Sequence, residues 1–160
     1  MSALRVISCL AEQIKVVEKR VQSQVKKTPL YELLQSVNGI GPILAQTILL
    51  ETGDIRRFES VGDYASYCRL VDSEKVSNGK RKGKGNVKSG NKYLSWAYSE
   101  AAHFAVQFHP KIQRFYQHKA SKTKVPVAYK TVAHKLSRAC YHIMCNEIGC
   151  VPPFTHSVPR

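Results

Sequence analysis

The first 27 residues carry apolar side chains at steps of three and four, with charged and polar side chains between them. The apolar positions are Leu4, Ile7, Ala11, Ile14, Val17, Val21 and Val25. This spacing places the apolar side chains on one face of an amphipathic helix. Such a face fits either a short coiled coil or a helix that packs against the rest of its own domain, and both interpretations stay open. We therefore expect residues 1–27 to form a coiled-coil-like helix.

Helical spacing continues after residue 27, and prolines and capping residues predict where further helices begin and end. Prolines stand at the expected starts of helices: Pro29, Pro42, Pro110 and Pro126. Gly53 fits a C-terminal cap, and Ser60 with Asp63 after it fits a capping box. No segment shows a convincing strand pattern. The sequence therefore predicts an all-α fold, with a helical domain over residues 28–149 and a Pro-rich, non-helical tail over residues 150–160.

Residues 30–52 combine two short helices with a glycine-containing turn, Asn38-Gly39-Ile40-Gly41. This pattern resembles the helix-hairpin-helix motif of DNA-binding proteins. Two glycines let the backbone approach a phosphate, and the helix that follows offers N–H groups and its positive end. We expect Gly39, Ile40 and Gly41 to hold nucleic acid without reading its sequence. A helical hairpin without any ligand would show the same pattern, and that alternative stays open.

Positive charge is concentrated in one part of the chain. Residues 75–146 hold fifteen Lys and Arg residues and one acid, Glu100, so this stretch alone accounts for the net charge of +14. Periodicity is lost over residues 72–90, which are basic and rich in glycine. We expect a mobile basic loop there that becomes ordered on a polyanion, most often nucleic acid, although a merely soluble basic surface is the other interpretation. The residues expected to bind nucleic acid in and beside this loop are Lys80, Arg81, Lys82, Lys84, Lys88, Asn91 and Lys92.

Two serines, Ser73 and Ser77, stand at the entrance of the basic loop. A serine can attack a phosphodiester when nearby cations stabilise the transition state. Serine is common in loops rich in glycine and lysine, so the residues alone indicate a phosphate-binding strap rather than a catalytic loop.

Cysteine and histidine spacing predicts no metal site. The five cysteines stand at positions 9, 68, 140, 145 and 150 and include no CxxC pair, and the histidines share no common spacing. Free thiols in a reducing cytoplasm are the default for such a set. The sequence also has no signal-peptide pattern and no apolar stretch long enough to span a bilayer. We expect a cytoplasmic protein with no membrane partner and no cofactor in this chain.

Several short motifs follow one another in a fixed order over residues 30–147. They are Val37-Asn-Gly-Ile-Gly-Pro42, Glu51-Thr-Gly-Asp-Ile-Arg-Arg-Phe58, Tyr64-Ala-Ser-Tyr-Cys-Arg-Leu70, the basic loop with its serines, Lys88-Ser-Gly-Asn-Lys-Tyr-Leu94 and Ala133-His-Lys-Leu136. This order resembles the C-terminal transposase domain of the insertion sequence 110 family (the 110/116/902 group), which is related to Piv-type DNA invertases. Arg69 stands where that family usually has Gly before Leu-Val, and Asn78 stands where Gly is usual.

The resemblance implies a DNA-binding and strand-exchange domain that acts in DNA transposition and recombination. Family members pair this domain with a RuvC-like domain whose four acidic side chains bind a divalent metal such as Mg²⁺. This chain lacks those ligands and is expected to be inactive without them. The resemblance further implies a serine nucleophile, which we assign to Ser77 with Ser73 as the alternative. It also implies guidance by a structured RNA, homo-oligomers formed through the N-terminal helix, and association with the bacterial nucleoid.

Two other functions fit the same residues. One is a non-catalytic helix-hairpin-helix module that binds DNA or RNA, and a weaker one is a basic adaptor associated with RNA or the ribosome. All three functions predict binding that weakens strongly with salt, so only chemistry at serine separates the first from the others.

Overall fold

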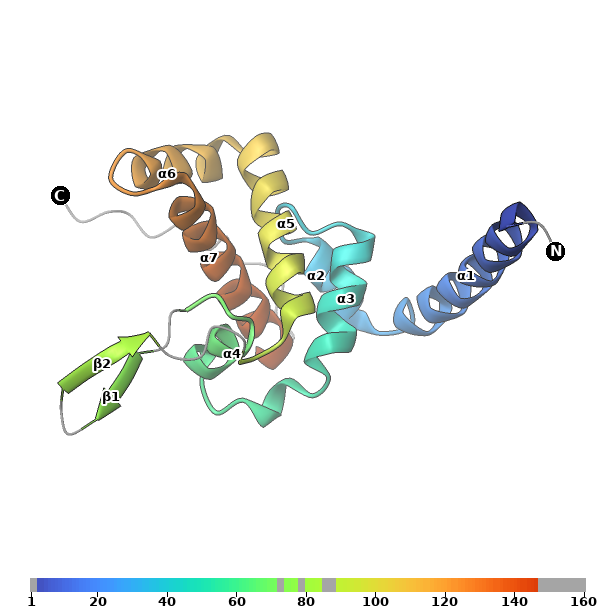
Figure 1. Cartoon of the computed structure of the whole chain (residues 1–160), viewed down its shortest axis with the longest axis horizontal. Coiled ribbons are helices and arrows are strands. Elements are labelled where there is room, and N and C mark those ends of the chain that lie inside the picture. The colour runs from blue at the N-terminus through green and yellow to red at the C-terminus, as the bar shows by residue number, and fades with distance from the viewer. Residues whose placement is uncertain (1–2, 72–73, 78–79, 85–88, 147–160) are drawn as a thin grey trace.

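The computed structural model describes the backbone of residues 3–71, 74–77, 80–84 and 89–146, and the side chains of residues 3–71 and 89–146. The described elements are α1 (Ala3–Val25), α2 (Pro29–Gln35), α3 (Pro42–Thr52), the 3₁₀ helix η1 (Ile55–Arg57), α4 (Val61–Tyr67), β1 (Glu74–Ser77), β2 (Lys80–Lys84), α5 (Lys92–Phe108), α6 (Pro110–Ala120) and α7 (Val125–Asn146). The predicted all-α class is confirmed. Figure 1 shows helices α2 to α7 gathered into one body, with α1 and the β1–β2 hairpin projecting from it.

The core is built around α5 and α7, which pack against each other. The buried face of α5 consists of Leu94, Ala97, Tyr98, Ala101, Ala102, Ala105 and Val106. Four alanines on this face leave room for neighbouring backbones to approach closely. The other helices of the body complete a single core with Leu34, Ile48, Tyr64, Ile112 and Leu136. The helix α5 therefore has one side committed to the core and only its outer side left for a ligand.

Three buried hydroxyl groups link α3, α4 and α5 inside this core. The Oγ1 of Thr52 lies 3.0 Å from the Oη of Tyr64, which lies 2.7 Å from the Oη of Tyr98. Burial raises the pKa of both tyrosines well above its ordinary value, so both stay neutral. Each hydroxyl has a partner, as buried polar groups require. The chain of hydroxyls fixes the C-terminal end of α3 and the middle of α4 against α5.

Helices begin and end where the sequence predicts, at the positions where capping residues were identified. Gly53 ends α3 in the left-handed region, with φ of 62°. The Oγ of Ser60 accepts a hydrogen bond from the N–H of Asp63, and the Asp63 carboxylate accepts one from the N–H of Ser60, so the predicted capping box is complete. Thr28 occupies the N-cap position of α2, but its side chain makes no capping hydrogen bond.

A β-hairpin lies within the basic loop, where the sequence predicted neither strands nor regular structure. The strands β1 and β2 pair antiparallel, with Ser77 opposite Lys80. The expectation of an irregular segment is therefore wrong for these two strands. The pairing leaves two residues between the strands, and in the sequence they are Asn78-Gly79. Asn-Gly between two short strands is the most typical sequence of a two-residue hairpin connection, so a signal for the hairpin was present.

The first helix, α1, is confirmed as a helix but touches the body only near its C-terminal end (Figure 1). Val21 and Val25 pack on the core, whereas Leu4, Ile7, Ile14 and Val17 are exposed. In this chain α1 is therefore not packed along its length against its own domain, and the coiled coil stays a prediction. Neither α1 nor any other helix in the described ranges combines the length and the hydropathy that crossing a membrane requires.

Candidate nucleic-acid interface

The turn between α2 and α3, residues 36–41, packs directly on α5. Ile40 is buried, and its N–H donates to the carbonyl of Val37 over 3.0 Å. Gly39 has φ of 90°, and a Cβ at this position would lie 2.8 Å from the backbone nitrogen of Ala105. No residue with a side chain could bring the turn so close to α5. The requirement for glycine at position 39 therefore comes from packing inside the protein.

Gly41 has a different environment from Gly39. It is the N-cap of α3 with φ of −86°, and a Cβ there would meet nothing within 4 Å. The next N–H groups belong to Ile43 and Leu44, in the first helical turn, where helices leave N–H groups without an intrahelical partner. Of the three hairpin residues predicted to hold nucleic acid, Gly41 is the one that faces open space, whereas the side chain of Ile40 belongs to the core.

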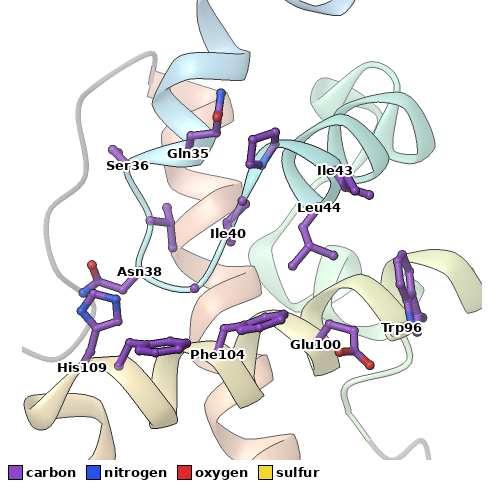
Figure 2. A pocket seen from close by; sticks show the side chains of 15 residues that line it. Gln35, Ser36, Asn38, Ile40, Ile43, Leu44, Trp96, Glu100, Phe104 and His109 are labelled. Carbon is purple, nitrogen blue, oxygen red and sulfur yellow. The ribbon is translucent and has the colours of Figure 1, made fainter. Parts of the chain in front are cut away.

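A groove of ≈ 610 Å³ lies between this turn and α5 (Figure 2). We call it the hairpin groove. Its α5 wall presents Trp96, Phe104 and Phe108, all exposed, and Ile43 at the start of α3 is exposed as well. Of the described residues that line it, Glu100 is charged and none is Lys or Arg. The hairpin groove is therefore apolar and supplies no cation for a phosphate.

The two ends of the basic loop meet at the loop neck, formed by Tyr67–Leu70 and Gly90–Asn91. The N–H of Asn91 donates to the carbonyl of Tyr67 over 2.7 Å. The guanidinium of Arg69 donates to the carbonyl of Gly90 from Nε at 3.0 Å and from Nη2 at 2.7 Å. Arg69 has φ of 59°, in the left-handed region, where a side chain costs about 1–2 kcal/mol. Glycine adopts this conformation without that cost.

Asn91 was predicted to bind nucleic acid, and the structure gives its side chain two internal roles. Its Oδ1 accepts hydrogen bonds from the N–H groups of Tyr93 at 2.8 Å and Leu94 at 3.1 Å, which caps α5. Its Nδ2 donates to Oε2 of Glu51 over 2.7 Å. Asn91 therefore joins α3 to the start of α5. Lys92, its neighbour, is exposed with its ammonium group 4.9 Å from the Tyr93 ring centre, and its binding of nucleic acid stays a prediction.

The remaining predicted site residues lie in the basic loop. Ser77 is the last residue of β1, and β2 contains Lys80, Arg81, Lys82 and Lys84. The structure therefore brings the preferred serine and these cations together on one hairpin at the level of the backbone. The alternative nucleophile, Ser73, and the cation Lys88 lie outside the described residues.

A second cavity, of ≈ 450 Å³, opens at the loop neck and was not foreseen from the sequence. We call it the neck pocket. Arg69 and Leu70 of the neck, polar side chains of α5 and the first turns of α7 line it, and the full set is Arg69, Leu70, Ser95, Ser99, His103, Val125, Pro126, Tyr129 and Lys130. One signal was available in the sequence, because Ser95, Ser99 and His103 recur at steps of four and so share one helix face.

Helices α6 and α7 carry a cationic surface. From Ala101 to Asn146 the sequence has no acid and eight Lys and Arg residues, namely Lys111, Arg114, Lys119, Lys122, Lys124, Lys130, Lys135 and Arg138. Burial, followed by the charges of Arg138 and Lys119, lowers the pKa of Lys135. Burial, followed by Arg138 and Lys135, likewise lowers the pKa of His134. Cations crowded in this way favour a polyanionic partner.

Thiols and imidazoles do not form a metal site in the part of the chain that the structure describes. No three of its His, Cys, Asp and Glu side chains come together as ligands. Among the described cysteines, Cys68 and Cys140 are buried, Cys9 and Cys145 are exposed, and none of the four is in a disulfide. Burial raises the pKa of Cys68 to about 12, so this thiol stays protonated and unreactive.

Comparison with known proteins finds a match to the protein family described as "Transposase IS116/IS110/IS902 family" over residues 31–117. The matched range includes the hairpin turn, the basic loop with its neck, α5 and most of α6. It therefore covers the greater part of the candidate interface.

Two curated relatives agree with that match. The chain is 30% identical over 89 residues to a "Probable family 20 transposase" of Pseudomonas aeruginosa, a range that covers 55% of this chain and 26% of the relative. It is 25% identical over 118 residues to the "Insertion element IS110 uncharacterized 43.6 kDa protein" of Streptomyces coelicolor, which covers 74% of this chain and 29% of that protein. The matched part of this chain thus corresponds to less than a third of either relative's length.

Proposed function

Because the chain belongs to the IS116/IS110/IS902 family of transposases, we propose that it is the DNA-handling domain of a transposase and carries the serine that attacks the DNA strand. The cationic surface of α6 and α7 and the basic loop hold the phosphate backbone. The hairpin turn at Gly41 adds a contact at the N-terminal end of α3. These contacts position DNA without reading its bases, since they recognise phosphate.

The observation that carries this proposal is the acid-free stretch from Ala101 to Asn146 with its eight cations. Burial is the largest cause of the lowered pKa values of Lys135 and His134, and repulsion from neighbouring cations, Arg138 foremost, adds to it. Phosphates relieve this repulsion, and the release of their counterions drives binding. Six of the eight cations lie on α6 and α7, which pack on the core, so the backbone positions of these six are fixed before a partner arrives.

Chemistry in this proposal takes place at Ser77, with Ser73 as the alternative. The serine Oγ loses its proton and forms a bond to phosphorus while the phosphorus–oxygen bond to one DNA end breaks, and that end leaves as a hydroxyl. Cations of the β1–β2 hairpin stabilise the charge that develops on the phosphate oxygens. In this proposal a divalent metal such as Mg²⁺ is held by the acidic residues of a RuvC-like domain, as the family resemblance implies, and not by this chain.

Two partners complete the proposal. A structured RNA encoded by the mobile element guides the choice of DNA site, and the cationic surface suits RNA as well as DNA because both offer phosphates. A second copy of the chain binds through α1, whose apolar face carries Leu4, Ile7 and Ile14 in exposed positions. Burying these side chains against a partner helix removes them from water.

We expect DNA binding to depend on the cationic surface rather than on net charge alone. Replacing the exposed residues Arg114, Lys122 and Lys124 with glutamine should weaken binding of duplex DNA by about tenfold or more and reduce the salt slope of log Kd by about two to three. Titrations of labelled duplex at several salt concentrations measure both quantities.

The matched control removes the same charge from α1, by replacing the exposed residues Arg5, Lys15 and Lys19 with glutamine. This variant should keep most of the affinity and the slope. Equal losses in the two triple variants would show that the chain binds DNA through overall charge and not through α6 and α7.

Gly41→Asp should abolish the hairpin contact with DNA without unfolding the protein. The new side chain enters open space, and Asp is a preferred N-cap residue, so α3 should be as stable as before. Its negative charge then repels a phosphate at the end of α3. Gly41→Asn has nearly the same shape without the charge and should bind DNA as the unchanged protein does. Unaltered duplex affinity in folded Gly41→Asp would remove the hairpin from the mechanism.

A further inference from the structure

The outer side of α5 is divided into two strips with opposite chemistry. Successive residues of a helix point about 100° apart, so residues at steps of four stay together while their neighbours in sequence turn to another face. Trp96, Glu100 and Phe104 form one strip, which faces the hairpin groove. Ser95, Ser99 and His103 form the other, which lines the neck pocket. Of the two strips on α5, only the one toward α7 therefore suits a ligand that carries phosphates.

The neck pocket combines cations and hydrogen-bonding groups from separate elements. Arg69 comes from the loop neck, Lys130 from α7, and Ser95 and His103 from α5. None of the described residues that line the pocket is acidic. Two cations that line one cavity together with hydroxyl and imidazole groups match the charge and the several acceptor oxygens of a phosphodiester.

Contacts of Arg69 and His103 with neighbouring residues hold two walls of the neck pocket in place. The guanidinium of Arg69 is tied to the carbonyl of Gly90, and this is the residue that the fold keeps at a positive φ. The ring of His103 stacks on Tyr129 with ring centres 4.0 Å apart, and Tyr129 in turn lies 4.4 Å from the ring of Tyr116. Arg69 is the left-handed residue that ends α4, where the N–H of Leu70 donates to the carbonyl of Ala65 over 3.1 Å, so the end of this helix determines where Arg69 stands.

We propose that the neck pocket binds one backbone phosphate of the nucleic-acid strand and so sets the register of that strand relative to the basic loop. This inference rests on the proposed function of the chain. The strand β1 begins at Glu74, four residues after Leu70, and four residues span at most about 14 Å. The pocket therefore lies at the foot of the hairpin that carries Ser77, a few nucleotides from any bond that this serine attacks.

Ser99→Asp tests the pocket by placing a negative charge in it. Ser99 is exposed, so the larger side chain should not disturb the fold, and thermal unfolding checks that it does not. Ser99→Asn introduces a side chain of nearly the same shape as aspartate but without its charge. Ser8→Asp makes the same substitution on the exposed surface of α1, outside the pocket and outside α6 and α7, and serves as the second control. The probes are a short DNA single strand, the RNA of the same sequence and the DNA duplex, each labelled and titrated with the 160-residue chain.

We expect Ser99→Asp to weaken binding of at least one probe by about tenfold or more, because an acid placed against a phosphate is strongly unfavourable. Ser99→Asn and Ser8→Asp should stay within about threefold of the unchanged protein. A loss confined to RNA or to DNA identifies which strand supplies the phosphate, and either result supports the pocket. Equal losses in Ser99→Asp and Ser8→Asp would overturn the pocket while leaving the proposed function intact. A chain that binds none of the three probes would overturn both.

Discussion

Replacing Ser77 with alanine in the full-length transposase should remove the covalent protein–DNA intermediate, a loss on the order of a thousandfold or more. The reason is that no other group at the end of β1 can form the bond to phosphorus once the hydroxyl is gone. A nicked DNA substrate, which traps the joined species, lets the adduct be counted on a denaturing gel in the presence of Mg²⁺ and the guide RNA. DNA affinity should not change, because the hydroxyl contributes little to holding the backbone.

The matched control is Ser73→Ala, which should keep the adduct. If Ser73→Ala loses it and Ser77→Ala keeps it, the nucleophile is Ser73. If both single variants keep the adduct, the attacking group lies elsewhere in the transposase. A protein that binds DNA but never forms an adduct would make this chain a non-catalytic nucleic-acid-binding module, the alternative considered from the sequence.

Gly39→Ala should destabilise the chain by about 3 kcal/mol, which can be enough to prevent folding of a marginally stable domain. Two costs add up in this variant. A residue with a Cβ is unfavourable at φ of 90°, and the new Cβ would lie 2.9 Å from the Cβ of Ala105. The helix α5 cannot move away, because its opposite side is packed in the core against α7.

Gly41→Ala is the matched control for that experiment, since a Cβ at position 41 meets nothing within 4 Å and φ is −86°. Its effect on stability should be below about 1 kcal/mol. Unfolding by denaturant, followed through helical circular dichroism, gives both values. Equal stability of the two variants would show that the contact between the hairpin turn and α5 does not hold the turn in place.

The helices were predictable from the sequence because local chemistry determines their ends. Pro42 begins α3, Gly53 ends it, and Ser60 with Asp63 forms the capping box that begins α4. These are interactions between residues close together in the chain, so their sequence spacing carries the information. The order of motifs likewise identified the family, which the match over residues 31–117 confirms.

The features that escaped prediction depend on contacts between distant residues. The Gly-Ile-Gly pattern does not distinguish Gly39 from Gly41. Close packing against α5 requires glycine at position 39, whereas position 41 faces open space. Asn91 looked like a surface residue in a basic segment, but a bond to Glu51, forty positions earlier, gives it an internal role. The neck pocket combines residues from three separate parts of the chain, so no single stretch of sequence contains it.

The β1–β2 hairpin escaped prediction for a different reason. Its strands are short and rich in lysine, and lysine and glycine are poorly represented in strands. The Asn78-Gly79 dipeptide was the only strong local sign of the pairing, and it was read as part of an irregular loop.

The loop neck also bears on how such a protein can diversify. The chain leaves the helical body at Leu70 and returns at Gly90. Hydrogen bonds across the loop neck hold these two points of the chain together. Insertions or deletions between these points cost little, because the entropy of closing a loop grows only slowly with its length. Mutation can therefore lengthen, shorten or recharge this segment while the helices around it stay unchanged. Lineages with the same helical scaffold can in this way acquire loops suited to different nucleic acids.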